Sequence, residues 1–227
     1  MSGHCALDVG GTRLMLLAER ALVWPDRHML CVADLHFGKA AAFRALGQPV
    51  PSGTTADNLR RLDALLAVWP TRRLVFLGDF LHARGARTPE VLAQLQAWRA
   101  RHPQLACTLV RGNHDRHAGD PPSQLGIDAV DEPWLLHPLA LRHHPVAMPG
   151  HHVLAGHEHP VFRLQGRGRQ QLRLPCFHHT RAMTVLPSFG DFTGGMPVAT
   201  GPDSQLFVTD GTAVWPIPPA PGTTATR

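Results

Sequence analysis

The sequence lacks several features that define common classes of protein. No stretch of its 227 residues approaches about 20 uninterrupted apolar residues, so we expect no transmembrane helix. The start, Met1-Ser2-Gly3-His4, has no basic segment followed by an apolar block, so no secretion signal is expected. The four cysteines contain no Cys-x-x-Cys pair, which favours reduced thiols in a cytoplasmic protein.

Lysine is almost absent, and the basic residues are nearly all arginine. Of 22 basic residues only one, Lys39, is lysine. The net charge of +5 and the pI of about 9.8 favour a polyanionic partner such as DNA. The abundance of arginine, alanine and proline is equally typical of a GC-rich genome, so the charge has two possible origins. No internal repeat is visible.

The first half of the chain alternates predicted strands and helices. A hairpin over 12–18 and 21–24 leads into a strand over 29–33, and further strands are expected over 74–77 and 105–110. Helices are predicted over 56–68 and from Thr88, the expected N-cap, onwards. The segment 37–54, rich in glycine, proline and small residues, is predicted to be a long loop.

After residue 120 the pattern changes to short β segments separated by proline and glycine. These are predicted over 139–142, 152–155, 161–164, 171–175, 182–186, 205–209 and 213–216. An alternating half followed by a β-rich half predicts an α/β (α+β) fold, a four-layer αββα sandwich of two mixed sheets flanked by helices. We expect one domain over 1–215 and a flexible tail over 216–227.

Five short motifs with metal-ligand side chains recur along the chain, and apolar runs precede them. They are Asp34-Leu35-His36, Gly78-Asp79, Gly112-Asn113-His114-Asp115, Arg142-His143-His144-Pro145 and Gly156-His157-Glu158-His159. Ligands at strand ends gather at one rim of a sheet. Carboxylate, amide and imidazole donors without thiolate suit two divalent ions of the manganese, iron or zinc type. Two close cations need a shared carboxylate, and Asp79 is the expected bridge.

In this order the motifs resemble those of the calcineurin-like metallophosphoesterases, over most of the chain. Other stretches are similar to one bacterial group of that family, the ligase-associated DNA damage response endonucleases. These stretches are residues 21–25, 34–40, 44–53, 175–177 and 186–195. The resemblance implies the same αββα sandwich and a metal-dependent phosphodiesterase that cleaves DNA with a dinuclear-metal-activated hydroxide. It also implies a role in repair beside a DNA ligase and helicase.

The resemblance further implies roles for individual residues. One ion would be held by Asp34, His36 and His159, and the other by Asn113, His143 and His157, with His144 as the alternative to His143. His114 would donate a proton to the leaving oxygen while Asp115 orients its imidazole; the alternative is a structural pair. Phosphate contacts are expected from Lys39, Arg44 and Arg111, although Lys39 and Arg44 could equally belong to a solvated loop.

Three functions compete at this stage. The leading hypothesis is a DNA endonuclease with two Mn²⁺ ions, with iron or zinc possible. The second is a small-molecule phosphatase or cyclic-nucleotide phosphodiesterase, whose metal core would look the same. The third is a catalytically silent scaffold, which is expected to have lost ligands or the proton donor. Phe189 and Phe192 could form a wall of the cleft for base stacking, or belong to the core.

Overall fold

The computed structural model describes residues 3–45, 47–50, 53–166, 170–191 and 193–218. Seven strands form the first sheet, and they lie side by side in chain order. They are β1 (His4–Val9), β2 (Thr12–Leu17), β3 (Ala21–Trp24), β4 (Met29–Val32), β5 (Arg73–Leu77), β6 (Ala106–Val110) and β7 (Ile127–Val130). The first four strands are antiparallel to their neighbours, whereas β4 to β7 run parallel.

The second sheet has nine strands in the order β14-β11-β12-β13-β10-β9-β8, with β15 on β12 and β16 on β15. The strands are β8 (Trp134–Leu136), β9 (Leu139–Leu141), β10 (His152–Ala155), β11 (Pro160–Gln165), β12 (Gln171–Thr180), β13 (Met183–Val185), β14 (Met196–Val198), β15 (Ser204–Thr209) and β16 (Val214–Pro216). Within this mixed sheet β9, β10 and β13 run parallel to one another.

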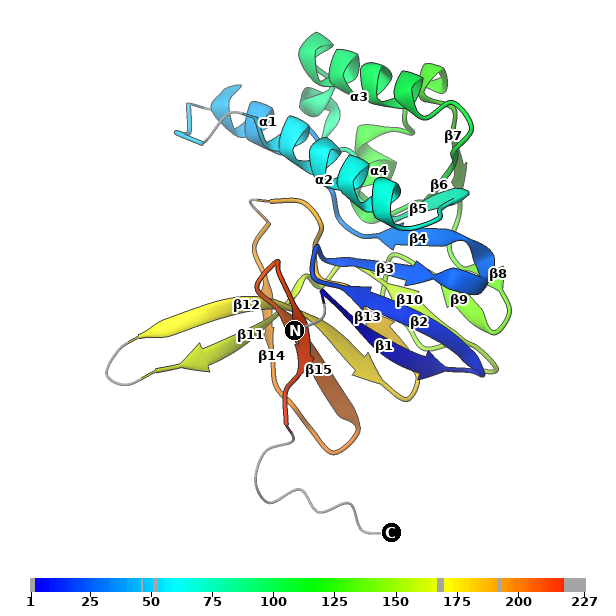
Figure 1. Cartoon of the computed structure of the whole chain (residues 1–227). Coiled ribbons are helices and arrows are strands. Elements are labelled where there is room, and N and C mark those ends of the chain that lie inside the picture. The colour runs from blue at the N-terminus through cyan, green and yellow to red at the C-terminus, as the bar shows by residue number, and fades with distance from the viewer. Residues whose placement is uncertain (1–2, 46, 51–52, 167–169, 192, 219–227) are drawn as a thin grey trace.

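Four α-helices and three 3-10 turns occur in the described residues. They are α1 (Lys39–Ala45), α2 (Thr54–Val68), α3 (Pro89–Arg101), α4 (Asn113–Ala118), η1 (Pro25–Arg27), η2 (Arg84–Ala86) and η3 (Ser123–Leu125). Thr88 caps α3 by accepting a hydrogen bond from the backbone N–H of Val91. Helices α2 and α3 cover the outer face of the first sheet (Figure 1). None of the described helices is long and apolar enough to cross a membrane.

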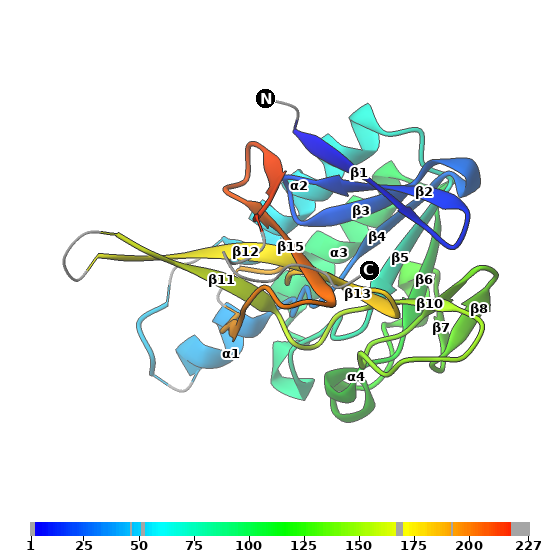
Figure 2. The ribbon, with the colours of Figure 1, turned by 90° about the horizontal axis from the view of Figure 1, so that it is seen from below.

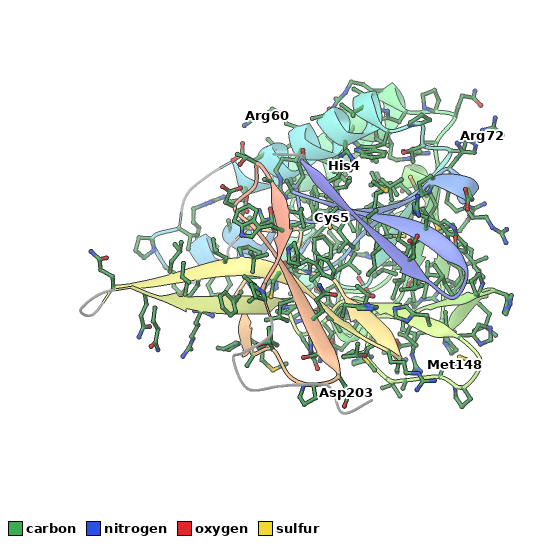
Figure 3. The ribbon with its side chains drawn as sticks, turned by 60° about the horizontal axis from the view of Figure 1, so that its bottom comes forward. His4, Cys5, Arg60, Arg72, Met148 and Asp203 are labelled. Carbon is green, nitrogen blue, oxygen red and sulfur yellow. The ribbon has the colours of Figure 1, made fainter. Side chains whose placement is uncertain are left out.

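The alternation of side chains along the first sheet builds two cores. Leu30 and Phe76 point to α2 and α3, where they pack with leucines of both helices. Cys31 and Val75, one residue along, point to the second sheet and pack against Phe177. Side chains therefore fill the space between the sheets as well as the space under the helices (Figure 3). Both faces of β4, β5 and β6 are buried, which explains their uninterrupted apolar sequences.

The sandwich of two mixed sheets confirms the predicted fold class, with two differences in detail. The described helices all lie before residue 126, so they gather on the first sheet instead of flanking both; no later described segment forms one. Helix α1 forms inside the predicted loop 37–54, because Lys-Ala-Ala-Ala-Phe-Arg-Ala consists mostly of good helix formers.

Strands β1, β7, β8 and β14 were not predicted from the sequence. The predicted tail starts inside β16, where Pro216 pairs with Phe207. Residues 219–227 lie outside the described residues.

Candidate metal centre

The candidate ligands lie at the carboxyl ends of parallel strands from both sheets. Asp34, Asp79 and Asn113 follow β4, β5 and β6 in the first sheet. His143 and His157 follow β9 and β10 in the second. Since parallel strands end at the same edge, each sheet brings its ligands to one rim, and the packing of the two sheets brings the rims together.

Asp79 lies at the middle of this cluster and faces a histidine with each carboxylate oxygen. Its Oδ2 is 3.6 Å from His36 Nε2, and its Oδ1 is 3.5 Å from His143 Nε2. The backbone N–H of His114 also donates to Oδ1, at 3.0 Å. A carboxylate placed in this way could give one oxygen to each of two ions.

The second buried carboxylate, Asp34, connects the remaining histidines. Its Oδ1 is 3.5 Å from His159 Nε2, and the backbone N–H of His157 donates to both of its oxygens. His157 Nδ1 in turn lies 3.0 Å from His143 Nε2, and Asn113 Oδ1 lies 2.9 Å from the same His143 nitrogen. The structure thus brings together all seven side chains expected to hold metal.

The chemistry of these groups fits divalent cations. Both ring nitrogens of His36 and Nε2 of His159 are buried without a hydrogen-bond partner. Oxygens of Asp34 and Asp79 lie within 4.8 Å of each other, and both residues are buried. Burial, and next the charge of Asp34, raise the pKa of Asp79. Burial lowers the pKa of His36, so its imidazole is neutral and offers a lone pair. Bound cations would offset the free-energy cost of burying these charged and polar groups.

The backbone around the ligands adopts conformations that side chains rarely take. Asp34, His36, Asp79, His157 and His159 all have φ between +47° and +72°. They make up five of the seven described non-glycine residues with positive φ. Such strain persists where surrounding structure enforces it, and it clusters at functional sites. Its concentration at five candidate ligands supports this rim as the candidate site.

Glu132, which the sequence gave no reason to select, holds the His143-His144 turn. One of its oxygens accepts hydrogen bonds from the backbone N–H groups of both histidines, at 2.8 and 3.0 Å. Its other oxygen lies 2.6 Å from His144 Nδ1. His144 is therefore tied to a carboxylate at the edge of the cluster, whereas His143 is fully buried within it.

His114 lies beside the cluster and is oriented by a backbone carbonyl. Its Nδ1 donates to the carbonyl oxygen of His82 at 2.7 Å, which leaves Nε2 3.9 Å from Asp79. The His82 ring stacks on that of His114 at 5.2 Å and on that of Phe43 at 5.7 Å. His82 was missed because its only signal is a position three residues after Asp79.

The structure corrects the expected role of Asp115. Its buried carboxylate does not orient the imidazole of His114. It accepts instead from the backbone N–H groups of Gly112, Asp79 and Phe80, at 2.7–3.0 Å. Asp115 therefore joins the turn after β5 to the turn after β6, because three backbone donors converge on the space that its side chain occupies.

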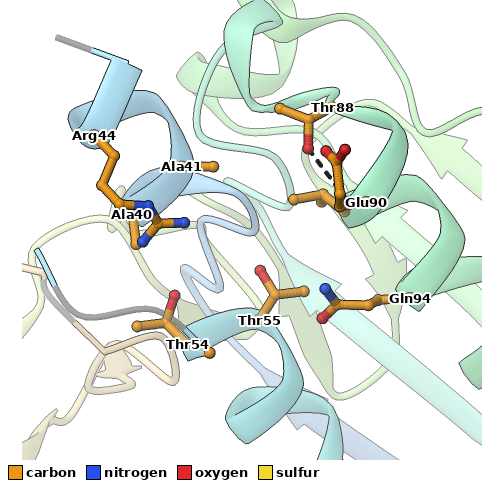
Figure 4. A pocket seen from close by; sticks show the side chains of 10 residues that line it. Ala40, Ala41, Arg44, Thr54, Thr55, Thr88, Glu90 and Gln94 are labelled. Atoms are coloured by element: carbon orange, nitrogen blue, oxygen red, sulfur yellow. Dashed lines mark hydrogen bonds between the residues drawn. The ribbon is translucent and has the colours of Figure 1, made fainter.

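The three candidate phosphate contacts lie in different surroundings. Lys39 begins α1 next to the centre: burial lowers its pKa, while Asp79 acts in the opposite direction. Arg44 lines a separate cavity of about 290 Å³ between α1 and the starts of α2 and α3 (Figure 4). Arg111 pairs with Asp120 at 2.7 Å and with Asp131 at 3.2 Å, so two carboxylates already balance its charge.

The segment that follows β13 packs against the first ligand motif. Ser188 Oγ donates to the carbonyl oxygen of Asp34 at 2.8 Å. Phe189 belongs to the core and not to a stacking wall: it is fully buried, with the Arg61 guanidinium 4.1 Å from its ring centre. Phe192 lies outside the described residues.

Two carboxylates, an amide and four histidines meet at a rim of two packed sheets, in groups that could hold metal ions. The calcineurin-like phosphoesterase family model matches residues 28–167, and the chain belongs to this family. A comparison with curated protein sequences finds no match.

Solved structures add a close relative. The Pseudomonas putida nuclease MPE, known from a crystal structure, is 48% identical in sequence to this chain. The match has a TM-score of 0.84 and covers 94% of this chain and 100% of that chain. A protein of unknown function from Aquifex aeolicus, AQ665, is 19% identical with a TM-score of 0.38, over 62% of this chain and 82% of that chain. The second likeness is too weak to support an argument.

Proposed function

We propose that this chain is a nuclease that hydrolyses phosphodiester bonds of DNA. The observation that carries the proposal is the convergence of Asp34, His36, Asp79, Asn113, His143, His157 and His159 on one rim. The likeness to the P. putida nuclease MPE over nearly the whole chain supports nucleic acid as the substrate. The net charge of +5 is favourable for a polyanion.

The seven residues would hold two divalent ions, Mn²⁺ in our proposal, with Asp79 between them. When bound, such ions polarise phosphate oxygens and supply a nucleophile from water near neutral pH. His114 presents Nε2 beside the cluster, because Nδ1 is occupied by the His82 carbonyl oxygen. It would give its proton to the leaving oxygen. Lys39, at the start of α1, would contact the phosphate.

The biological setting is proposed from the same resemblance. We place the protein in the cytoplasm, acting in DNA repair with a ligase and helicase system. All four cysteines are unpaired, which suits a reducing compartment.

The test is a cleavage assay on purified protein that has been stripped with a chelator and reloaded with Mn²⁺. We expect DNA strands to be cut, and nucleotide monoesters to be turned over slowly or not at all. Fe²⁺ and Zn²⁺ are compared in parallel. Rapid turnover of a monoester or cyclic nucleotide with intact DNA would contradict the proposal and favour a small-molecule phosphoesterase.

A further inference from the structure

The hairpin of β11 and β12 projects from the body of the molecule (Figures 1 and 2). Strand β14 pairs with β11 only at residues 160–162, and β15 pairs with β12 only at residues 176–180. Beyond these points, residues 163–165 and 171–173 pair only with each other. We call this two-stranded part the ribbon. Neither edge of the ribbon pairs with another described strand.

The two faces of the ribbon differ in chemistry. Arg163 lies directly opposite Arg173, and Gln165 opposite Gln171, on one face. The other face carries Leu164 opposite Leu172. Like charges directly opposite each other destabilise a strand pair. Neither arginine of this pair forms an ion pair with any described residue.

The sequence around the ribbon strengthens this charge. From His159 to Gly190 there is no aspartate or glutamate, although the segment contains five arginines. Two of these, Arg167 and Arg169, lie outside the described residues. An acid-free basic segment that contains a projecting ribbon is open to an anionic partner.

Hydrogen bonds connect the arginine face to the metal centre. Arg173 Nη2 donates to the carbonyl oxygen of Gly195 at 2.6 Å. The neighbouring carbonyl, of Gly194, lies 3.1 Å from Nδ1 of the candidate ligand His159. Arg163 follows His159 by four residues, a distance of roughly 13 Å along an extended strand. A linear polymer bound at the metal centre would therefore reach the arginine face within a few of its monomer units.

We propose that Arg163 and Arg173 bind phosphates of the nucleic-acid strand whose scissile linkage lies at the metal centre. This inference rests on the proposed nuclease function. A two-stranded ribbon can follow a nucleic-acid backbone or enter a groove. An arginine guanidinium can donate two parallel hydrogen bonds to phosphate oxygens, and the side-chain amides of the adjacent glutamines supply further donors to phosphates or base edges. An acidic protein would be bound through charge alone.

The test measures how binding of a 20-nucleotide phosphorothioate oligonucleotide to the Mn²⁺-loaded protein depends on salt. This probe keeps the charge of each linkage and resists hydrolysis. For the double variant R163A/R173A we expect affinity to fall about tenfold at ~0.1 M salt. The slope of log affinity against log salt should fall by about 1.4, since each single-strand phosphate contact contributes ~0.7. Turnover of bis-nitrophenyl phosphate by the double variant reports whether the metal centre survives the loss of the hydrogen bond from Arg173 to Gly195.

Two control variants distinguish a specific role of the ribbon from a general effect of lost charge and from an effect on folding. Arg181→Ala removes an exposed arginine of the same acid-free segment at the other end of β12, and should leave the slope unchanged. The variant R163K/R173K keeps both charges and should retain most of the slope. The loss of slope is divided by the number of arginines removed, one in Arg181→Ala and two in R163A/R173A. If this loss were the same in both variants, any surface arginine would contribute equally, and the ribbon assignment would be overturned.

The remaining outcomes are decided by substrate and competitor. If R163A/R173A kept the salt slope of the unaltered protein and the unaltered protein cleaved DNA, the ribbon assignment would be overturned and the proposed nuclease function would stand. Turnover of the small ester without DNA cleavage would overturn the proposed function and this inference with it. Polyglutamate that displaces the oligonucleotide as well as DNA of equal charge would also overturn it, because the ribbon would then be a general anion surface.

Discussion

Asp79 turns one carboxylate oxygen toward His36 and the other toward His143, two histidines that are expected to hold different ions. We therefore predict that Asp79→Ala empties both metal positions. His159→Ala, which removes a ligand from only one side, should empty mainly one position. Metal analysis of stripped and reloaded protein measures this, with about two ions expected for the unaltered chain. Full occupancy in the Asp79 variant would contradict the bridging role.

His114 is held by the His82 carbonyl oxygen and is not one of the seven grouped ligands. We predict that His114→Ala keeps its metal content and loses about 10²–10⁴-fold in turnover of DNA, the usual size of a general-acid effect. The loss should shrink for a nitrophenyl ester, whose leaving oxygen needs no proton. An equal loss for both substrates would instead assign His114 to phosphate binding or to structure.

At the scale of elements, the turn after β6 packs against the turn after β5 without room for a side chain. Gly112 has an ordinary φ of −98°, so alanine is allowed there by the backbone. A Cβ would nevertheless meet the Asp79 carboxylate and lie 2.8 Å from the Asp79 backbone nitrogen. Gly78 meets the same limit, because a Cβ there would run into the His143 imidazole.

We predict that Gly112→Ala destabilises the fold by about 1–3 kcal/mol, the usual cost of overpacking, and weakens metal binding through displacement of Asp79. Urea unfolding and metal titration measure the two effects. Gly85→Ala is the matched control, since a Cβ at Gly85 has nothing within 4 Å. If both variants bound metal like the unaltered chain, close packing of the turns would not be what places Asp79.

At the scale of the whole molecule, a histidine pair in the second sheet couples stability to pH. His152 Nε2 and His179 Nδ1 both contact Thr184 Oγ1, at 2.8 and 2.9 Å. Burial lowers the pKa of His152, and burial together with His152 and His178 lowers that of His179 to about 4. Below about 6.5, the ordinary histidine value, the unfolded chain binds protons that the folded chain does not.

This contribution to stability is therefore complete above about pH 6.5 and is lost as the pH falls through about 4. We predict that His179→Gln makes the free energy of unfolding less dependent on pH in that window. Urea unfolding of metal-free protein at pH 8, 6 and 5 measures the difference from the unaltered chain. The exposed His28→Asn serves as control, since asparagine tolerates the positive φ at that position. Identical pH dependence of His179→Gln and the unaltered chain would contradict the assignment.

The sequence selects residues that the structure brings together where several local signals coincide. Apolar runs that end in Asp, His or Asn identify buried strands and their carboxyl ends, and parallel strands must present these ends at one rim. The same reasoning could not reach Glu132 or His82, because neither stands at the end of an apolar run. Their importance arises from contacts with His143 and His114, which lie 11 and 32 residues away in the chain.

The sequence by itself determined the family, the two-sheet sandwich and the identity of the ligand candidates, because those features depend on residue type and spacing. The tertiary structure alone decided which groups face each other. It assigned Asp115 to three backbone donors, Arg111 to two aspartates and Phe189 to the core. It also placed Arg163 opposite Arg173, with no ion pair from either to another described residue. These outcomes depend on the packing of segments that are distant in sequence, and no local pattern records it.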